Sequence, residues 1–195
     1  MIYSPILVTG GTGKTGRRVV ERLQAKQIPV RIGSRSAAIP FDWKNRSTWE
    51  DALRGIKAVY ITYQPDLAVP GALEDIAAFS AQAVAMGVQR LVLLSGRGED
   101  EAQACERRVQ AAGVEWTIVR ASWFNQNFDE NFLLEPIRAG LVALPAGDVL
   151  EPFIDADDIA DVVTAALTSS DHSAQVYELT GPRLMTFGQA IAEIA

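Results

Sequence analysis

Residues 8–16, VTGGTGKTG, combine four glycines with a Gly-Lys-Thr triplet, and such residues bind phosphate groups through backbone N–H donors. A nucleoside-triphosphate P-loop needs its first glycine five positions before the glycine of that triplet. Counting back from Gly13 reaches Val8, so a P-loop is excluded. The spacing Gly10-x-x-Gly13-x-x-Gly16 fits instead a wide form of the dinucleotide-binding turn, which holds a diphosphate at the N-terminus of the next helix. We therefore expect cofactor contacts along the whole turn, from Gly10, Gly11, Thr12, Gly13, Lys14, Thr15 and Gly16.

The end of the second expected strand indicates which dinucleotide binds. An NAD-binding chain carries an acid there, whereas residues 30–35 read VRIGSR and contain none. A 2′-phosphate would find the guanidinium of Arg35, the hydroxyl of Ser34 and, from the glycine turn, the amine of Lys14. The alternative is that Arg35 is a solvated loop residue, and we favour NADP(H) over NAD(H). Asp42 suits either a hydrogen bond to the adenine amine or a turn that precedes a helix.

Short apolar runs alternate with amphipathic segments through the first two thirds of the chain, and these elements must position the glycine turn. The pattern predicts strands at 6–9, 29–32, 58–62, 90–94 and 116–119, and helices at 14–26, 71–86 and 99–112. A short helix through Leu53 is predicted to open on a capping box formed by Ser47 and Glu50. Such alternation is typical of an α/β fold, a Rossmann-type doubly wound parallel sheet with helices on both faces.

The pattern changes after Arg120, where aromatic and amide residues with helix-like spacing occupy 123–139. A helix at 157–168, opened by Asp155 or Asp157, and a strand at 175–179 follow. A last helix is predicted from Thr186 to Ala195, with Thr186 and Gln189 as its capping box. We expect residues 1–122 to form the nucleotide-binding core, and 123–195 a small, incomplete substrate-side subdomain interleaved with late sheet elements.

Composition excludes several classes of protein. The formal charge of −6 and the absence of basic clusters argue against direct binding of nucleic acid. No apolar run is long enough to cross a membrane, and no basic segment leads into an apolar stretch as in a secretory signal. The single cysteine, Cys105, suits a reducing compartment, so we expect a cytoplasmic protein. We expect Cys105 to be a partly exposed helix residue rather than a reactive thiol.

These residues resemble those of the NmrA-like family of atypical short-chain dehydrogenase/reductases, and in particular its quinone reductases and redox-sensing relatives. The resemblance covers nearly the whole chain. Its more specific part is the block Trp116-Thr117-Ile118-Val119-Arg120 with the tail Trp123-Phe124-x-x-Asn127. The other matching segments are 9–16, 59–62, 91–95, Glu106, 155–160 and 176–181. Because NmrA-like relatives generally continue past the position of Ala195, the resemblance also implies a truncated or reduced chain here.

The resemblance places a substrate pocket between residues 95–98, residues 120–127 and the loop after Thr62. Thr62, Tyr63 and Ser95 are then expected on the cofactor side. The residues expected to line the pocket are Gly96, Arg120, Trp123, Phe124, Asn125 and Asn127. For Trp123 and Phe124 a role in the core is as plausible as one in the pocket, and Trp116 is expected in the core.

Ordinary short-chain dehydrogenases use a Tyr-x-x-x-Lys pair as general acid, but residues 99–112 contain neither tyrosine nor lysine. The only histidine, His172, is expected in a distant surface loop. No catalytic residue and no metal ligand is therefore assigned, and carbonyl reduction or sugar-nucleotide epimerisation is disfavoured. Two hypotheses remain: direct hydride transfer to a small-molecule acceptor such as a quinone, or a redox sensor that binds NAD(P)(H) and acts through a protein partner. A homo-oligomer is compatible with either.

Overall fold

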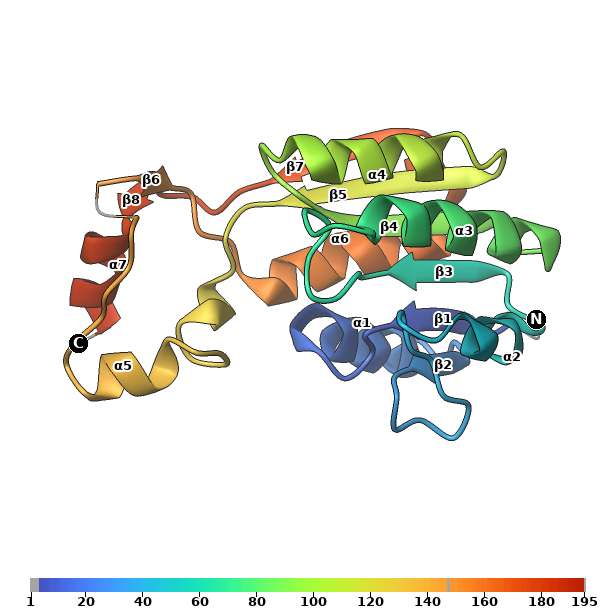
Figure 1. Ribbon diagram of the computed structural model, residues 1–195, viewed down its shortest axis with the longest axis horizontal. Helices are drawn as coiled ribbons and strands as arrows, with labels where there is room; N and C mark the ends of the chain where they lie inside the picture. Colours follow the sequence, from blue (N-terminus) through green and yellow to red (C-terminus); the bar gives the residue numbers. More distant parts are fainter. Residues whose placement is uncertain (1–3, 147, 195) are drawn as a thin grey trace.

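The computed structural model describes residues 4–146 and 148–194, and its centre is a six-stranded sheet (Figure 1). The strands are parallel and lie in the order β2-β1-β3-β4-β5-β7. Because the order reverses between β1 and β3, the chain is a doubly wound Rossmann-type sheet, as the alternating pattern predicts. The strands are β1 (Ile6–Thr9), β2 (Val30–Gly33), β3 (Ala58–Ile61), β4 (Arg90–Gly96), β5 (Glu115–Ala121) and β7 (Gln175–Leu179).

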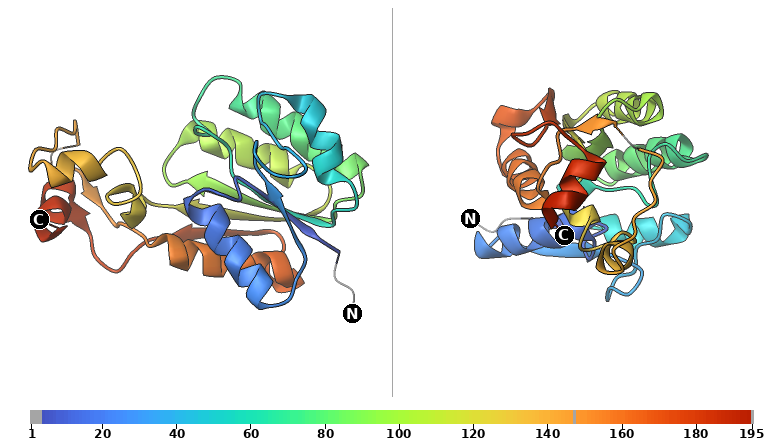
Figure 2. Two further views of the ribbon diagram at one scale, coloured as in Figure 1. Left: turned by 90° about the horizontal axis from the view of Figure 1, so that it is seen from below. Right: turned by 90° about the vertical axis from the view of Figure 1, so that its left-hand side faces the viewer.

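Helices cover both faces of this sheet (Figure 2). Alternate residues of each strand point to opposite faces, so Leu7 of β1 and Val59 of β3 pack into one apolar layer, and Val8 and Tyr60 into the other. The first layer lies under the helices α2 (Trp49–Leu53), α3 (Ala72–Ala85) and α4 (Asp100–Gln110). The second lies under α1 (Lys14–Ala25) and α6 (Ala156–Thr168).

A small outer unit lies beyond the carboxyl ends of the strands, at the left of Figure 1. It contains a 3₁₀ turn (Asn125–Asn127), α5 (Leu134–Arg138), a two-stranded ladder of β6 (Leu150–Glu151) with β8 (Met185–Thr186), and α7 (Phe187–Ile194). Its own apolar core consists of Phe128, Leu133, Phe153, Phe187 and Ala190. The helix-like spacing of 123–139 does not give one helix, because the backbone at Phe124 and Asn125 pairs with Ile154 instead.

Three extended segments cross between the sheet and the outer unit, and hydrogen bonds join them. The backbone N–H of Ser122 donates to the Leu179 carbonyl, and that of Gly181 donates to the Pro152 carbonyl. The Ser122 hydroxyl also donates to Pro152 at 2.7 Å. Any side chain at Gly181 would collide with the carbonyl oxygen of Phe153. We call these segments, residues 122–125, 152–154 and 179–181, the crossing junction.

The late elements α6 and β7 return to the sheet, so residues 123–194 do not form one continuous unit. Asp155 caps α6, because its side chain accepts a hydrogen bond from the Asp157 N–H. The capping box of the last helix is confirmed, since Thr186 and Gln189 exchange both hydrogen bonds. The expected end of that helix, Ala195, lies outside the described residues.

Two local predictions are wrong. Ser47 and Glu50 form no capping box, because the side chain of Asn45 accepts the Ser47 N–H and opens a 3₁₀ turn (Arg46–Thr48) before α2. Cys105 lies on α4 as expected, but it is fully buried in the first apolar layer rather than partly exposed. Burial, together with Glu74 and Glu106, raises the pKa of its thiol to about 11, so the thiol is not a reactive one.

Within residues 4–146 and 148–194, no helix has the length and apolar character needed to cross a membrane. In the same ranges, no three His, Cys, Asp or Glu side chains gather in a way that could hold a metal ion.

Candidate nucleotide-binding and active site

The glycine turn joins β1 to α1 at the point where the strand order reverses. Gly10 has a φ of +60°, a conformation that other residues rarely adopt, and Gly13 donates its N–H to the Gly10 carbonyl at 2.8 Å. A side chain at Gly16 would collide with that same carbonyl. The first turn of α1 carries no acidic residue, so the positive end of its dipole faces the turn unopposed. The turn therefore has the shape and charge that a diphosphate requires.

Two threonines lock the carboxyl ends of β1 and β3 together beside this turn. The Thr9 hydroxyl accepts the Thr62 N–H at 2.8 Å, and the Thr62 hydroxyl donates to the Thr9 carbonyl at 2.8 Å. Below them, the buried Tyr60 hydroxyl donates to Thr15 at 3.0 Å. A side chain at Gly10 would collide with the Thr62 hydroxyl, so this lock fixes where the turn lies. Thr15, expected on the cofactor, is instead buried in this contact.

A first cavity of about 500 Å³ opens on the β2 side of the turn. It holds Ser34 and Arg35, the residues expected at a 2′-phosphate, and Asp42. Asp42 also makes the alternative turn, because its carboxylate accepts the Lys44 N–H at 3.0 Å. The full lining is Gly10, Thr12, Gly33, Ser34, Arg35, Ser36, Phe41, Asp42, Trp43, Lys44, Thr62, Gln64 and Pro65. Lys44 adds a second cation to this cavity, and no spacing rule links it to the glycine turn.

A second cavity, also of about 500 Å³, lies on the β4 side and shares Thr62 and Pro65 with the first. It brings together Tyr63, Ser95, Gly96, Trp123, Phe124 and Asn127, all of which the sequence analysis places near the cofactor or substrate. The other residues that line it are Lys14, Asp66, Leu67, Leu94, Arg97, Glu99, Ala121, Ser122, Asn131, Phe132 and Glu151. The two cavities form one crevice over the carboxyl ends of the strands, where doubly wound proteins bind their ligands.

Three of the expected site residues lie elsewhere. Lys14 lines the second cavity, whereas Arg35 lines the first. Desolvation lowers the pKa of the Lys14 amine. Asn125 faces a separate cavity inside the outer unit, because the backbone pairing at Phe124 turns the chain at this point. Arg120 does not line the second cavity either, because its guanidinium is committed to an ion pair.

That ion pair is buried between β5 and α4. Arg120 donates to both carboxylate oxygens of Glu106, at 2.9 and 2.7 Å, and to Glu178 at 3.1 Å. Ser95 donates its hydroxyl to Glu106 at 2.6 Å. The Glu106 side chain is only 2% exposed, so its charge depends on these partners. The cluster anchors the wall of the second cavity rather than reaching into it.

The aromatic residues of the crevice serve both the cavity and the core. The Trp123 ring packs edge-on against Phe187, with centroids 5.3 Å apart, and Phe124 packs against the second apolar layer. Trp116 packs against the first layer, as expected. Tyr63 contacts Trp43 and donates its hydroxyl to Asp75 at 2.9 Å. Burial and that carboxylate raise the pKa of Tyr63 to about 12, so its phenol is a poor proton donor at neutral pH.

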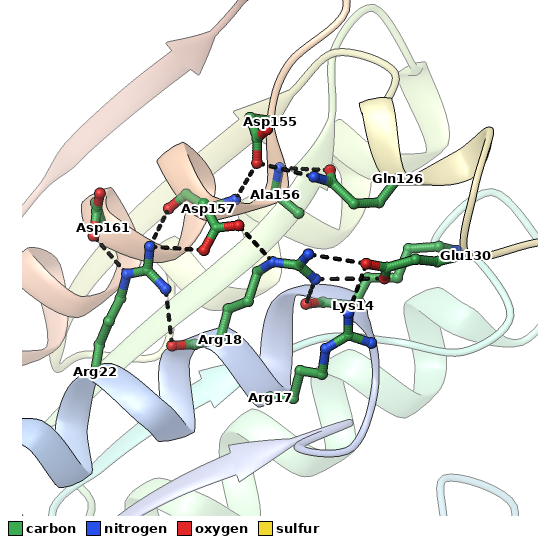
Figure 3. A network of polar contacts seen from close by, with 10 residues as sticks. All are labelled: Lys14, Arg17, Arg18, Arg22, Gln126, Glu130, Asp155, Ala156, Asp157 and Asp161. Carbon is green, nitrogen blue, oxygen red and sulfur yellow. Dashed lines mark hydrogen bonds and ion pairs between the residues drawn. The ribbon is translucent and has the colours of Figure 1, made fainter. Parts of the chain in front are cut away.

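A network of charges ties α1 to the outer unit and to α6 (Figure 3). Glu130, just beyond the 3₁₀ turn, accepts from Arg17 at 2.6 Å and from Arg18 at 2.9 Å. Arg18 and Arg22 both donate to Asp157, each at 2.9 Å. The partners are more than 100 residues apart in the chain, which is why the sequence does not reveal the network. It holds α1, the helix that begins at the glycine turn, against both neighbours.

This network gives a pH-dependent prediction. The guanidinium of Arg18, with Arg17, holds the pKa of Glu130 below its usual value. A carboxyl group whose folded pKa is depressed stabilises the fold above its unfolded pKa, about 4.3, and this is lost as the pH falls through the folded value. Glu130→Gln should therefore lower the free energy of unfolding by about 1 kcal/mol at pH 7. The difference from the wild type should shrink as the pH falls below about 4.3 and should vanish once the Glu130 carboxyl is protonated in the folded protein, as measured by urea unfolding across pH.

The matched control is Glu135→Gln, which removes an exposed carboxylate paired with Arg138 on the same outer unit. The unfolding curve of Glu135→Gln should coincide with that of the wild type both at pH 7 and in acid. An equal loss for Glu130→Gln at pH 7 and in acid would show that the network contributes nothing through charge.

The parallel sheet, the glycine turn and the crevice across the reversal point define a Rossmann-type dinucleotide-binding protein. Residues 10–170 match the family model described as NAD(P)H-binding. The chain is 34% identical to festuclavine synthase II of Penicillium roqueforti, over 97% of this chain and 72% of that protein. It is 30% identical to an NAD(P)H azoreductase of Xenophilus azovorans, over 97% of this chain and 72% of that protein. This protein belongs to the NAD(P)H-binding, NmrA-like family of atypical short-chain dehydrogenase/reductases.

Solved structures show the same fold. The NADPH-dependent quinone oxidoreductase of Escherichia coli, solved with NADPH, superposes with a TM-score of 0.77 at 23% identity and covers 97% of this chain and 74% of that one. The chain spans 65–72% of the length of the curated relatives reported for it.

Proposed function

We propose that this protein binds NADP(H) in preference to NAD(H) and transfers hydride directly to quinones or similar electrophilic acceptors. The observation that carries the proposal is the pair of cavities that meet at Thr62, one on each side of the glycine turn. One is lined by Ser34 and Arg35 and suits the adenosine half of the cofactor, and the other suits the nicotinamide and an acceptor. Reductases of quinones and azo compounds among the similar proteins support this choice of acceptor.

For the hydride transfer, the residues of the chain would bind and orient the cofactor and the acceptor. The glycine turn, whose packing leaves no room for a Cβ at Gly16, would hold the diphosphate. When bound, NADP(H) supplies the hydride. Trp123, Phe124 and Asn127 would hold a flat acceptor against the nicotinamide.

No Tyr/Lys pair is required by this chemistry. Tyr63 is bonded to Asp75, and Ser95 is bonded to Glu106, so neither hydroxyl is set up as a general acid. His172 contacts Tyr177 at 2.8 Å beside β7 and does not line the crevice. A quinone accepts hydride without prior protonation, which suits a site built for orientation.

The second candidate is a redox sensor that holds the cofactor and passes its state to a protein partner. Large apolar side chains exposed on the outer unit favour this reading: Phe132, Leu141, Val149, Leu150, Leu184 and Ile194. Steady-state oxidation of NADPH with a panel of quinones separates the two functions. Turnover above the uncatalysed background supports the reductase function. Rates equal to the background with every acceptor support the sensor function instead.

Cofactor preference gives a further prediction. Arg35→Ala should weaken NADP(H) binding about tenfold and leave NAD(H) binding nearly unchanged, because only NADP(H) carries the 2′-phosphate. Lys44→Ala should act in the same direction, since Lys44 lines the same cavity. Calorimetric titration of both nucleotides is the measurement. Lys26→Ala, an exposed cation at the far end of α1, is the control and should alter neither affinity. Equal weakening of both nucleotides by Arg35→Ala would place the 2′-phosphate elsewhere.

A further inference from the structure

We propose that Glu99 donates the proton that completes acceptor reduction, in place of the missing Tyr/Lys pair. This inference rests on the proposed reductase function and assigns a catalytic residue within it.

Glu99 stands immediately before α4 and reaches back over the end of β4. Its carboxylate covers Gly96 so closely that any Cβ there would collide with it. The carboxylate therefore forms part of the wall of the second cavity, with Ser95 on the same side and Lys14 among the other lining residues. Asn127 and Trp123 complete the space in which an acceptor would lie.

The carboxylates of the second cavity differ in their partners. Glu151 accepts a hydrogen bond from the backbone N–H of Trp123 at 2.8 Å. Asp66 accepts one from the backbone N–H of Ala68 at 2.8 Å. Within residues 4–146 and 148–194, the Glu99 carboxylate forms neither a hydrogen bond nor an ion pair. It is thus the carboxyl group of this cavity that remains available to a bound molecule.

The surroundings of Glu99 make its carboxyl group a weaker acid than usual. Burial raises its pKa above the usual value, and the negative charges of Asp66 and Glu101 act in the same direction. Of the other ionisable groups that line the cavity, Glu151 adds a further negative charge and Tyr63 is neutral, whereas Lys14 and Arg97 are cationic. Arg97 forms an ion pair with Glu178, at 3.7 Å.

The reaction balances with these groups. The quinone gains a hydride, which is two electrons and one proton together, from the dihydronicotinamide. It thereby becomes the hydroquinone anion. The Glu99 carboxyl O–H bond breaks as its proton passes to the anionic oxygen, and the carboxylate then regains a proton from water. The sum is NADPH, quinone and one proton giving NADP⁺ and hydroquinone.

The decisive variant is Glu99→Gln, compared with Glu101→Gln two residues along. Glu101 is exposed and does not line the cavity, so it controls for the loss of one negative charge. Glu99→Gln should lower kcat for quinone reduction about tenfold to a hundredfold, with the quinone KM and the NADPH Kd changed less than twofold. Glu101→Gln should leave KM and Kd unchanged and should keep the pH dependence of kcat, moved to slightly lower pH because the Glu101 charge helps to raise the pKa of Glu99. In the wild type, kcat should fall as the pH rises through the pKa of Glu99, and Glu99→Gln should lose this dependence.

A titration of the protein without cofactor or acceptor tests the pKa of Glu99 directly. Carboxyl-labelled glutamate followed by NMR should show one signal that titrates above the usual value of about 4.3 and that is missing in Glu99→Gln. Titration of Glu99 at or below that value would overturn the proton-donor role, as would an unchanged kcat. A loss confined to KM or Kd would make Glu99 a binding residue and equally overturn it. If the wild type reduces no acceptor above background, the reductase function itself fails, an outcome distinct from an active enzyme that does not need Glu99.

Discussion

Gly16→Ala should abolish measurable dinucleotide binding. The added methyl group would collide with the backbone of Gly10 and Gly11, so α1 must move away from the glycine turn. That movement breaks the alignment of the turn with the helix N-terminus on which diphosphate binding depends. We expect an affinity loss of at least about a hundredfold for NADPH, and about 1–3 kcal/mol less stability from the overpacking. Fluorescence titration of NADPH and urea unfolding measure the two effects.

Gly188→Ala is the matched control for this substitution. Gly188 lies in α7, where a Cβ would have no contact closer than 3.8 Å. Its replacement should leave NADPH affinity unchanged and should not lower stability, because alanine is the better helix former. NADPH binding by Gly16→Ala with wild-type affinity would disprove the assignment of this turn as the diphosphate cradle.

Arg120→Ala should give the largest loss of stability. It leaves the buried Glu106 carboxylate with Ser95 as its remaining hydrogen-bond donor. Removing one partner of a buried ion pair costs about 3–5 kcal/mol, because the other charge stays desolvated. The free energy of unfolding in urea should fall by that amount.

Arg97→Ala is the control for Arg120→Ala. Arg97 also faces Glu178, but it is 44% exposed and 3.7 Å from the carboxylate. Its loss should cost less than about 1 kcal/mol. A similar small loss for Arg120→Ala would mean that the ion pair with Glu106 contributes little to stability.

The sequence predicts the sheet well because apolar runs and glycines are local signals. β1, β3 and the glycine turn each follow from fewer than ten consecutive residues, and their physics does not depend on distant partners. The same holds for the capping box of Thr186 and Gln189, which lie three residues apart.

The candidate site is less predictable because it depends on contacts between distant residues. Arg120 has the charge of a substrate-binding residue, but Glu106 and Glu178, 14 and 58 residues away, determine where its guanidinium lies. Lys14 follows the glycine turn, and only the fold decides that it faces the second cavity. Glu99 has no motif, and its importance lies in a contact with Gly96 that a sequence pattern cannot show.

The structure of the outer unit is hard to predict from the sequence for a further reason. Its elements are two to eight residues long, so their periodicity is too brief to distinguish a helix from a turn. The pairing of Phe124 with Ile154 takes up backbone groups that a continuous helix would have used.

The crossing junction has a consequence for motion. A subdomain joined by a single segment can rotate about it as a hinge. Here the three segments of the crossing junction are hydrogen-bonded to one another. The close approach of Gly181 to Phe153 leaves no room for one strand to rotate past the other. Large hinge opening would have to break these hydrogen bonds together, so the walls contributed by the sheet and by the outer unit should keep their spacing. An acceptor would then enter the crevice without a movement of the outer unit.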